Sequence, residues 1–188
     1  MEILYKSPRD ISMMELKRDS VFKKIAPDRY DELIAFAWER GETNAIKYMD
    51  KLSTSIPSEM INKLHINVIL KKWEKGASNI QFYSEYADKP TTITLYENSI
   101  AEALGNAISH GNNQVTSVVA AKEIFLAHEL YHHIECRDIG LASKERKVFM
   151  LKWGPFKLTS GIRALCEIGA HAFSKFLLEK NNYYRNIL

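Results

Sequence analysis

Apolar residues in the first third of the chain recur every three or four positions, with charged residues between them. This spacing predicts amphipathic helices over residues 10–24 and 28–52, with Gly41 marking a break or bend in the second one. The segment Ser55-Ile-Pro57 begins a further short helix that runs to Leu64. We therefore expect residues 1–54 to form a helical N-terminal extension.

The pattern changes after residue 65, where short runs of β-branched and aromatic residues replace the helical spacing. Glycine, asparagine and proline separate three such runs, which cover residues 66–70, 80–83 and 91–96. These runs predict a small antiparallel sheet. A short helix is expected over residues 99–109.

Two later apolar segments predict longer helices. Residues 115–134 are apolar on most sides, and Asn112 or Asn113 in the preceding loop is placed to cap this helix. Residues 163–178 carry apolar side chains at helical spacing. The chain is therefore expected to be α+β, with residues 55–188 and the N-terminal extension forming one compact unit.

Composition and charge narrow the function classes. The chain of 188 residues is 46% hydrophobic, enough for one domain with a real core. Its net charge of +3 is spread along the sequence, so direct nucleic-acid binding is not expected. The charged N-terminus predicts no secretion signal, and the histidines and charges within 115–134 argue against a membrane span. We expect a cytoplasmic protein with no membrane contact.

The only cysteines, Cys136 and Cys166, are too few and too far apart for a disulfide framework or a paired-cysteine zinc site. Small buried side chains are the simplest expectation for both.

The segment His128-Glu129-Leu130-Tyr131-His132 carries the candidate chemistry. On a helix, two histidines four positions apart are about 40° apart in angle and about 6 Å apart along the axis, so both imidazoles can reach one metal ion. Glu129 points about 100° away from His128 and is placed to act as a general base. The alternative is two hydrogen-bonded helix histidines beside a surface glutamate.

A catalytic zinc ion normally takes three protein ligands, so a third ligand is needed. Glu167 is a candidate, because it lies within the apolar helix predicted over 163–178, where a carboxylate must be paired or bound to a cation. His171 follows one turn later on the same face.

Residues 124–132, Ile-Phe-Leu-Ala-His-Glu-Leu-Tyr-His, resemble the active helix of the ImmA/IrrE-type zinc metallopeptidases, which usually runs Phe-Thr-Leu-Ala-His-Glu-Leu-Gly-His. A second family motif, Glu-x-x-Ala-Asn-x-Phe-Ala-x-x-Leu-Leu, is similar to residues 167–178. The resemblance covers mainly residues 56–180. It implies a minimal zincin-like fold, in which the small sheet packs on the active-site helix.

The resemblance also implies roles for individual residues. His128, His132 and Glu167 would hold one Zn²⁺ ion, and Glu129 would be the catalytic acid/base. In zincins the last strand before the active helix is commonly an exposed edge that binds the substrate backbone. By resemblance that edge would run from Thr92 to Tyr96, with Thr92, Thr94 and Tyr96 beside an extended peptide.

The chain departs from the family pattern at two positions, where His171 replaces asparagine and Tyr131 replaces glycine. His171 is expected to orient a histidine ligand, to approach the metal itself, or to be a core histidine. Tyr131, His133, His171 and Arg163 are all candidates for stabilising the oxyanion of a hydrolytic reaction. The sequence does not choose among them.

Together these observations predict a zinc-dependent endopeptidase. The resemblance implies a regulatory enzyme that cleaves a protein or peptide substrate such as a helix-turn-helix transcriptional repressor. Two alternatives stay open: a zinc hydrolase acting on another bond, and a catalytically quiet zincin-like scaffold whose N-terminal helices dock a partner.

Overall fold

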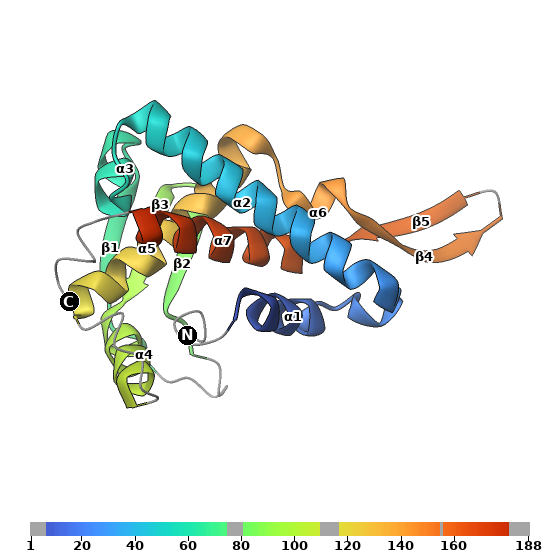
Figure 1. The fold of residues 1–188 in the computed structure, drawn as a ribbon, viewed down its shortest axis with the longest axis horizontal. Helices are drawn as coiled ribbons and strands as arrows, with labels where there is room; N and C mark the ends of the chain where they lie inside the picture. Colours follow the sequence, from blue (N-terminus) through green and yellow to red (C-terminus); the bar gives the residue numbers. More distant parts are fainter. Residues whose placement is uncertain (1–6, 75–80, 110–116, 155, 181–188) are drawn as a thin grey trace.

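The computed structural model describes residues 7–74, 81–109, 117–154 and 156–180, and it combines helices with two small sheets (Figure 1). This confirms the α+β class. The α-helices are α1 (Pro8–Arg18), α2 (Tyr30–Leu52), α3 (Pro57–Lys63), α4 (Glu97–Ser109), α5 (Val118–Ile134), α6 (Ala142–Glu145) and α7 (Ala164–Lys180). Shorter helical turns are η2 (Phe22–Lys24), η3 (Pro27–Arg29) and the π-helical η4 (Glu135–Ile139).

The strands are β1 (Asn67–Lys71), β2 (Ser84–Asp88), β3 (Thr91–Tyr96), β4 (Lys147–Trp153) and β5 (Phe156–Gly161). The first three form a sheet in the order β1-β3-β2, and the last two form a hairpin. β2 is antiparallel to β3, but β1 is parallel to β3, so the prediction of an antiparallel sheet is only half right. A parallel neighbour is possible because a long connection separates β1 from β3.

Two predicted strand positions need correction. The strand expected over 80–83 forms instead at Ser84–Asp88; Ile80 lies outside the described residues, and 81–83 are not in a strand. The expectation that Thr92, Thr94 and Tyr96 lie on an open edge is wrong, because β3 pairs with a neighbour on both sides. Thr92 and Thr94 are accordingly buried in the centre of the sheet.

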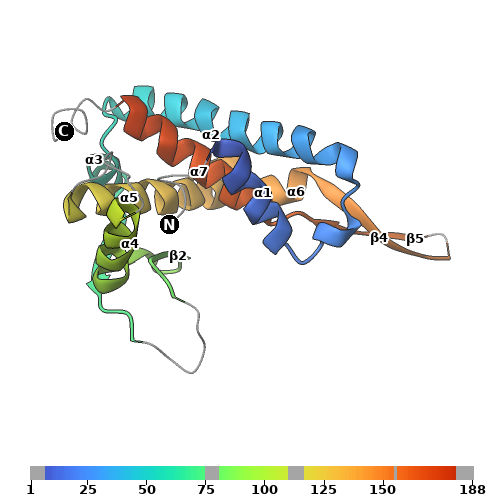
Figure 2. The ribbon, with the colours of Figure 1, turned by 60° about the horizontal axis from the view of Figure 1, so that its bottom comes forward.

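α2 and α7 lie side by side in both views of the ribbon (Figures 1 and 2). Gly41 does not bend α2, which is helical over all 23 residues. A Cβ atom at Gly41 would overlap the carbonyl oxygen of Gly169 and come within 2.7 Å of the Cβ of Ala172. Gly41 therefore allows the two helix backbones to approach closely.

α5 is the central helix of the core. It begins with Ser117, whose hydroxyl accepts a 3.1 Å hydrogen bond from the amide of Ala120. Asn112 and Asn113, expected as caps, lie outside the described residues. α5 packs against α3, α4, α7 and the sheet, so the small sheet does lie on this helix. Its last turn continues into η4.

Two clusters of buried residues make up the core. One surrounds α5, the sheet and the second half of α7, and the other joins α1, α2, α6 and the start of α7. The second cluster packs Leu33 and Ala37 of the N-terminal segment with Leu165 and Ile168. Residues 8–52 therefore share a core with α7, and a domain boundary after residue 54 stays a prediction.

The β4–β5 hairpin projects beyond the helices (Figures 1 and 2). The sequence analysis assigned no element to this segment. Several of its apolar side chains are exposed to solvent: Phe149 is 53% exposed and Phe156 is 76% exposed. Among the described residues, no helix is long and apolar enough to cross a membrane.

Candidate metal centre

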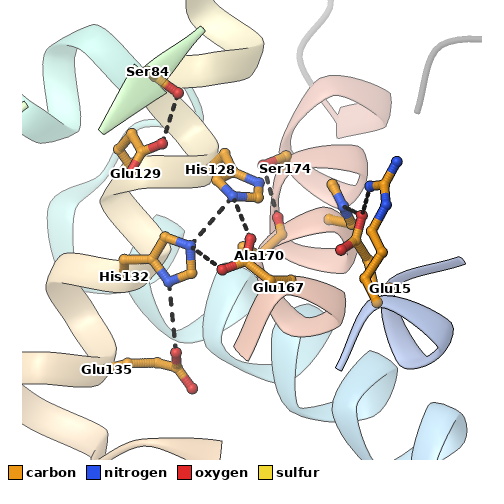
Figure 3. Close-up of polar contacts among 11 residues, drawn as sticks. Glu15, Ser84, His128, Glu129, His132, Glu135, Glu167, Ala170 and Ser174 are labelled. Atoms are coloured by element: carbon orange, nitrogen blue, oxygen red, sulfur yellow. Dashed lines mark hydrogen bonds and ion pairs between the residues drawn. The ribbon is translucent and has the colours of Figure 1, made fainter. Parts of the chain in front are cut away.

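α5 brings His128 and His132 together on one side, as their spacing predicts. The Nε2 atoms of the two rings are 3.2 Å apart, and the ring centroids are 4.9 Å apart (Figure 3). The surrounding residues of α5 are buried, so the helix is held rigidly. Two imidazole nitrogens thus converge on one point.

Glu167 completes the cluster from α7. One carboxylate oxygen, Oε2, is 3.2 Å from His128 Nε2, and the other, Oε1, is 3.6 Å from His132 Nε2. One ligand atom from each of the three residues can be chosen so that all lie within 4.8 Å of one another. Two segments 39 positions apart therefore meet where the sequence analysis expected them to meet.

The electrostatics of the cluster show a strong mutual attraction. Burial opposes ionisation of Glu167, but the hydrogen bonds and charges of His128 and His132 outweigh it and hold the pKa of Glu167 well below its usual value. Burial likewise opposes protonation of His132, but the nearby carboxylates of Glu135 and Glu167 outweigh it and raise the pKa of His132 to about 10. Both shifts favour a charged pair, with Glu167 ionised and His132 protonated.

The residues fit a zinc ion. Two histidines and one glutamate are a donor set that zinc takes in catalytic sites with three protein ligands. All three ligand residues are partly open to a cleft, so that a further position is accessible. Behind His132, a buried carboxylate oxygen of Glu135 has no hydrogen-bond partner among the described residues and lies 3.7 Å from His132 Nδ1.

Glu129 lies beside the cluster and is only 5% exposed. Its Oε1 accepts a 2.6 Å hydrogen bond from the hydroxyl of Ser84 on β2 (Figure 3). The alternative of a surface glutamate beside the histidines is therefore wrong. Ser84 was not singled out from the sequence, because only the packing of β2 on α5 brings it near Glu129.

Glu135 is a second residue that the sequence analysis missed. It lies in η4, three residues after His132, and its side chain is fully buried. The spacing alone was a signal, because residues three apart on a helix are neighbours. The oxygen of Glu135 that does not face His132, Oε1, accepts a 2.9 Å hydrogen bond from the amide of Ala142.

His171 lines the cleft but does not belong to the three-residue cluster. Its ring centroid is 5.0 Å from that of His128, and its Nε2 is 3.6 Å from Glu15 Oε1 on α1. Burial lowers the pKa of His171. This placement argues against the expectation that His171 approaches the metal itself.

The three other oxyanion candidates do not line the cleft. Tyr131 is fully buried against Gly169 and Phe173, and burial raises its pKa. His133 Nδ1 lies 3.0 Å from the hydroxyl of Tyr86. Arg163 is exposed just before α7. These placements argue against an oxyanion role for all three, and Tyr131 is a core residue.

The cleft itself has a volume of about 1320 Å³. Its walls come from α1, β2, α5 and α7, and they include the cluster, Glu129 and His171. β2 is an edge strand of the three-stranded sheet and lines the cleft through Ser84, Glu85 and Tyr86. Cys136 also reaches it; the expectation of a buried cysteine is wrong there, because Cys136 is exposed, whereas Cys166 is half-buried.

Comparison with models of protein families, with curated proteins and with solved structures found no match to this chain. The fold and the cluster define the chain as an α+β protein with a group of two histidines and one glutamate able to hold a metal ion.

Proposed function

We propose that this chain is a zinc-dependent endopeptidase with a zincin-like architecture. The observation that carries the proposal is the convergence of His128, His132 and Glu167 beside a buried, hydrogen-bonded Glu129 in an open cleft. Two helix histidines that only needed hydrogen-bond partners would not account for the buried Glu129 beside them or for the open cleft.

A bound zinc ion supplies a Lewis acid that polarises a carbonyl and lowers the pKa of water to near 7. The protein supplies the proton transfer. The Ser84 hydroxyl donates a hydrogen bond to Glu129 Oε1, which fixes the carboxylate. Oε2 is then left to accept the proton of the attacking water. Glu129 then returns this proton to the leaving nitrogen.

The shape of the cleft favours a polypeptide substrate. An extended peptide can add to the free edge of a sheet through backbone hydrogen bonds. Here β2 takes the place that the sequence analysis gave to Thr92–Tyr96, because β2 is the edge strand and its residues line the cleft. The resemblance to ImmA/IrrE-type peptidases adds a helix-turn-helix repressor as the substrate to test first, in a cytoplasmic setting.

The test compares the wild-type protein with Glu129→Gln in the presence of zinc. Each is incubated with the host proteome, and newly formed protein termini are mapped. We expect new termini only with the wild-type protein, while both bind one zinc ion. Glu39→Gln is the matched control, because Glu39 is an exposed glutamate on α2 that does not line the cleft.

Zinc binding without new termini in either sample would favour the catalytically quiet scaffold. Equal cleavage by Glu129→Gln would remove Glu129 from the reaction. Release of a product other than a peptide by the wild-type protein alone would favour a zinc hydrolase acting on another bond.

A further inference from the structure

Glu135 is a fully buried carboxylate that lies outside the three-residue cluster. Its oxygens have different surroundings: Oε1 accepts a hydrogen bond from the amide of Ala142, whereas Oε2 has no hydrogen-bond partner among the described residues. Oε2 lies 3.7 Å from His132 Nδ1 (Figure 3). A buried carboxylate oxygen is costly unless it is paired, so its placement toward the imidazole needs an explanation.

His132 lies between two carboxylates. Its Nε2 faces the cluster, 3.6 Å from Glu167 Oε1, and its Nδ1 faces Glu135. Neutral imidazole has one N–H donor and one acceptor nitrogen, and a carboxylate can only accept. A carboxylate behind Nδ1 therefore favours the tautomer that carries hydrogen on Nδ1 and leaves the lone pair of Nε2 for a metal.

Arg40 of α2 holds the segment that carries Glu135. Its Nη2 donates to the carbonyl oxygens of Ile139 and Gly140, at 2.9 and 2.7 Å, where η4 ends. Its Nε lies 3.9 Å from Glu135 Oε1, and its Nη1 is 2.5 Å from Glu145 Oε1. Arg40 thus places a positive charge against the buried carboxylate and fixes the backbone around it.

We propose that Glu135 is a positioning residue that orients His132 for metal binding, and that Arg40 holds Glu135 in place. The inference rests on the proposed zinc site and deepens it. Metal-ligating histidines generally need a partner for their second ring nitrogen, and loss of that partner typically costs 10- to 100-fold in metal affinity. A further consequence is that α2, within the predicted N-terminal extension, is part of the metal centre.

The experiment measures zinc affinity by competition with a chelating indicator for the full chain and two glutamine variants. Glu135→Gln removes the negative charge facing His132, and we expect its zinc affinity to fall about 10- to 100-fold. Glu39→Gln is the matched control, because Glu39 is an exposed glutamate on the same helix as Arg40 and does not line the cleft. Its affinity should equal that of the wild-type protein.

Two more variants keep the test valid if Glu135→Gln does not fold. Glu135→Asp keeps the charge but withdraws the carboxylate from His132. Arg40→Lys keeps the positive charge but cannot hold two carbonyls and two carboxylates with one compact ammonium group. Both are expected to bind zinc more weakly while circular dichroism shows an unchanged helical fold.

The spectrum of ¹⁵N-labelled histidine gives a readout that a merely structural role would not change. In the zinc-loaded wild-type protein, we expect the Nδ1–H of His132 to show the chemical shift of a hydrogen bond to a carboxylate, and we expect Glu135→Gln to lose that shift. Failure of the wild-type protein to bind zinc would overturn the proposed function itself. Zinc binding that is equally tight in the wild-type, Glu135→Gln, Glu135→Asp and Arg40→Lys proteins would overturn only the positioning role.

Discussion

The surroundings of the His128, His132 and Glu167 cluster and the β4–β5 hairpin distribute polarity in opposite ways. Around the cluster, the carboxyl side chains of Glu129 and Glu135 are buried among the apolar side chains of α5 and α7. In the hairpin, Phe149, Phe156 and Leu158 are more than half exposed. Buried charge costs stability unless it is paired, whereas exposed apolar side chains contribute little to the stability of the free chain. Single substitutions around the cluster should therefore change stability and chemistry more than substitutions in the hairpin do.

The largest effect is expected at the cluster. His132→Ala removes one of three ligands and should abolish stoichiometric zinc binding, because two remaining ligands rarely hold zinc in water. Metal analysis of the purified protein after dialysis measures this. His65→Asn is the control: His65 is exposed and has a positive φ of 55°, which asparagine tolerates. One zinc ion retained by His132→Ala would contradict the ligand assignment.

The contact between α2 and α7 should be the next most sensitive. Gly41→Ala adds a single methyl group against the backbone of Gly169, and overpacking of this kind costs about 1–3 kcal/mol or more. Urea denaturation followed by circular dichroism gives the free energy of unfolding. Gly105→Ala is the control within a helix, because a Cβ atom there meets nothing within 4 Å. An unchanged stability of Gly41→Ala would show that the two helices can separate freely.

A smaller and pH-dependent effect is expected in the metal-free protein. Folding raises the pKa of His132 from 6.5 to about 10, so the folded state binds the proton more tightly than the unfolded state does. This stabilisation is fully present below pH 6.5 and is lost as the pH rises through about 10. The thermal unfolding midpoint, measured at several pH values between 6.5 and 10 in the presence of a chelator, should therefore fall as the pH rises.

His132→Gln should flatten that dependence. Saturating zinc should also remove the loss of stability at high pH, since a metal ion replaces the proton on the imidazole. A midpoint that rises with pH in the metal-free wild-type protein would contradict the direction of the shift.

The smallest effect is expected at the hairpin. Phe156→Ser and Leu158→Ser shorten exposed side chains, so each should change the free energy of unfolding by no more than about 0.5 kcal/mol. Zinc affinity should not change. A loss comparable to that of Gly41→Ala would mean that these side chains are covered in solution, which gel filtration of the variants would then test.

The sequence predicted well what depends on spacing along one helix. The pairing of His128 with His132, the place of Glu167 on a later helix and the helices themselves follow from apolar periodicity, and the structure agrees within a few residues at the helix ends. Glu135 was missed, although the same spacing rule applies to it: it lies three positions after His132, where α5 continues into η4.

Tertiary contacts could not be predicted in this way. Ser84 and Arg40 reach the site from segments 45 and 95 residues away from their partners, and no local pattern marks either. Strand order was also hidden, so β3 was expected at the edge although β1 and β2 flank it. The hairpin was missed because Phe149, Leu151, Phe156 and Leu158 are exposed and, among its described residues, only Val148 is buried in the core, so the apolar pattern of this segment does not indicate burial.

The cleft draws its walls from segments far apart in the sequence, since Ile11, Met14 and Glu15 of α1 line it together with Glu167 and Ser174 of α7. During translation, the ribosome releases the first of these helices long before it synthesises the second. The complete cavity cannot exist on a nascent chain that stops short of α7. The proposed hydrolytic activity therefore requires that synthesis of α7 is finished, and translation fragments that stop before α7 should be inert.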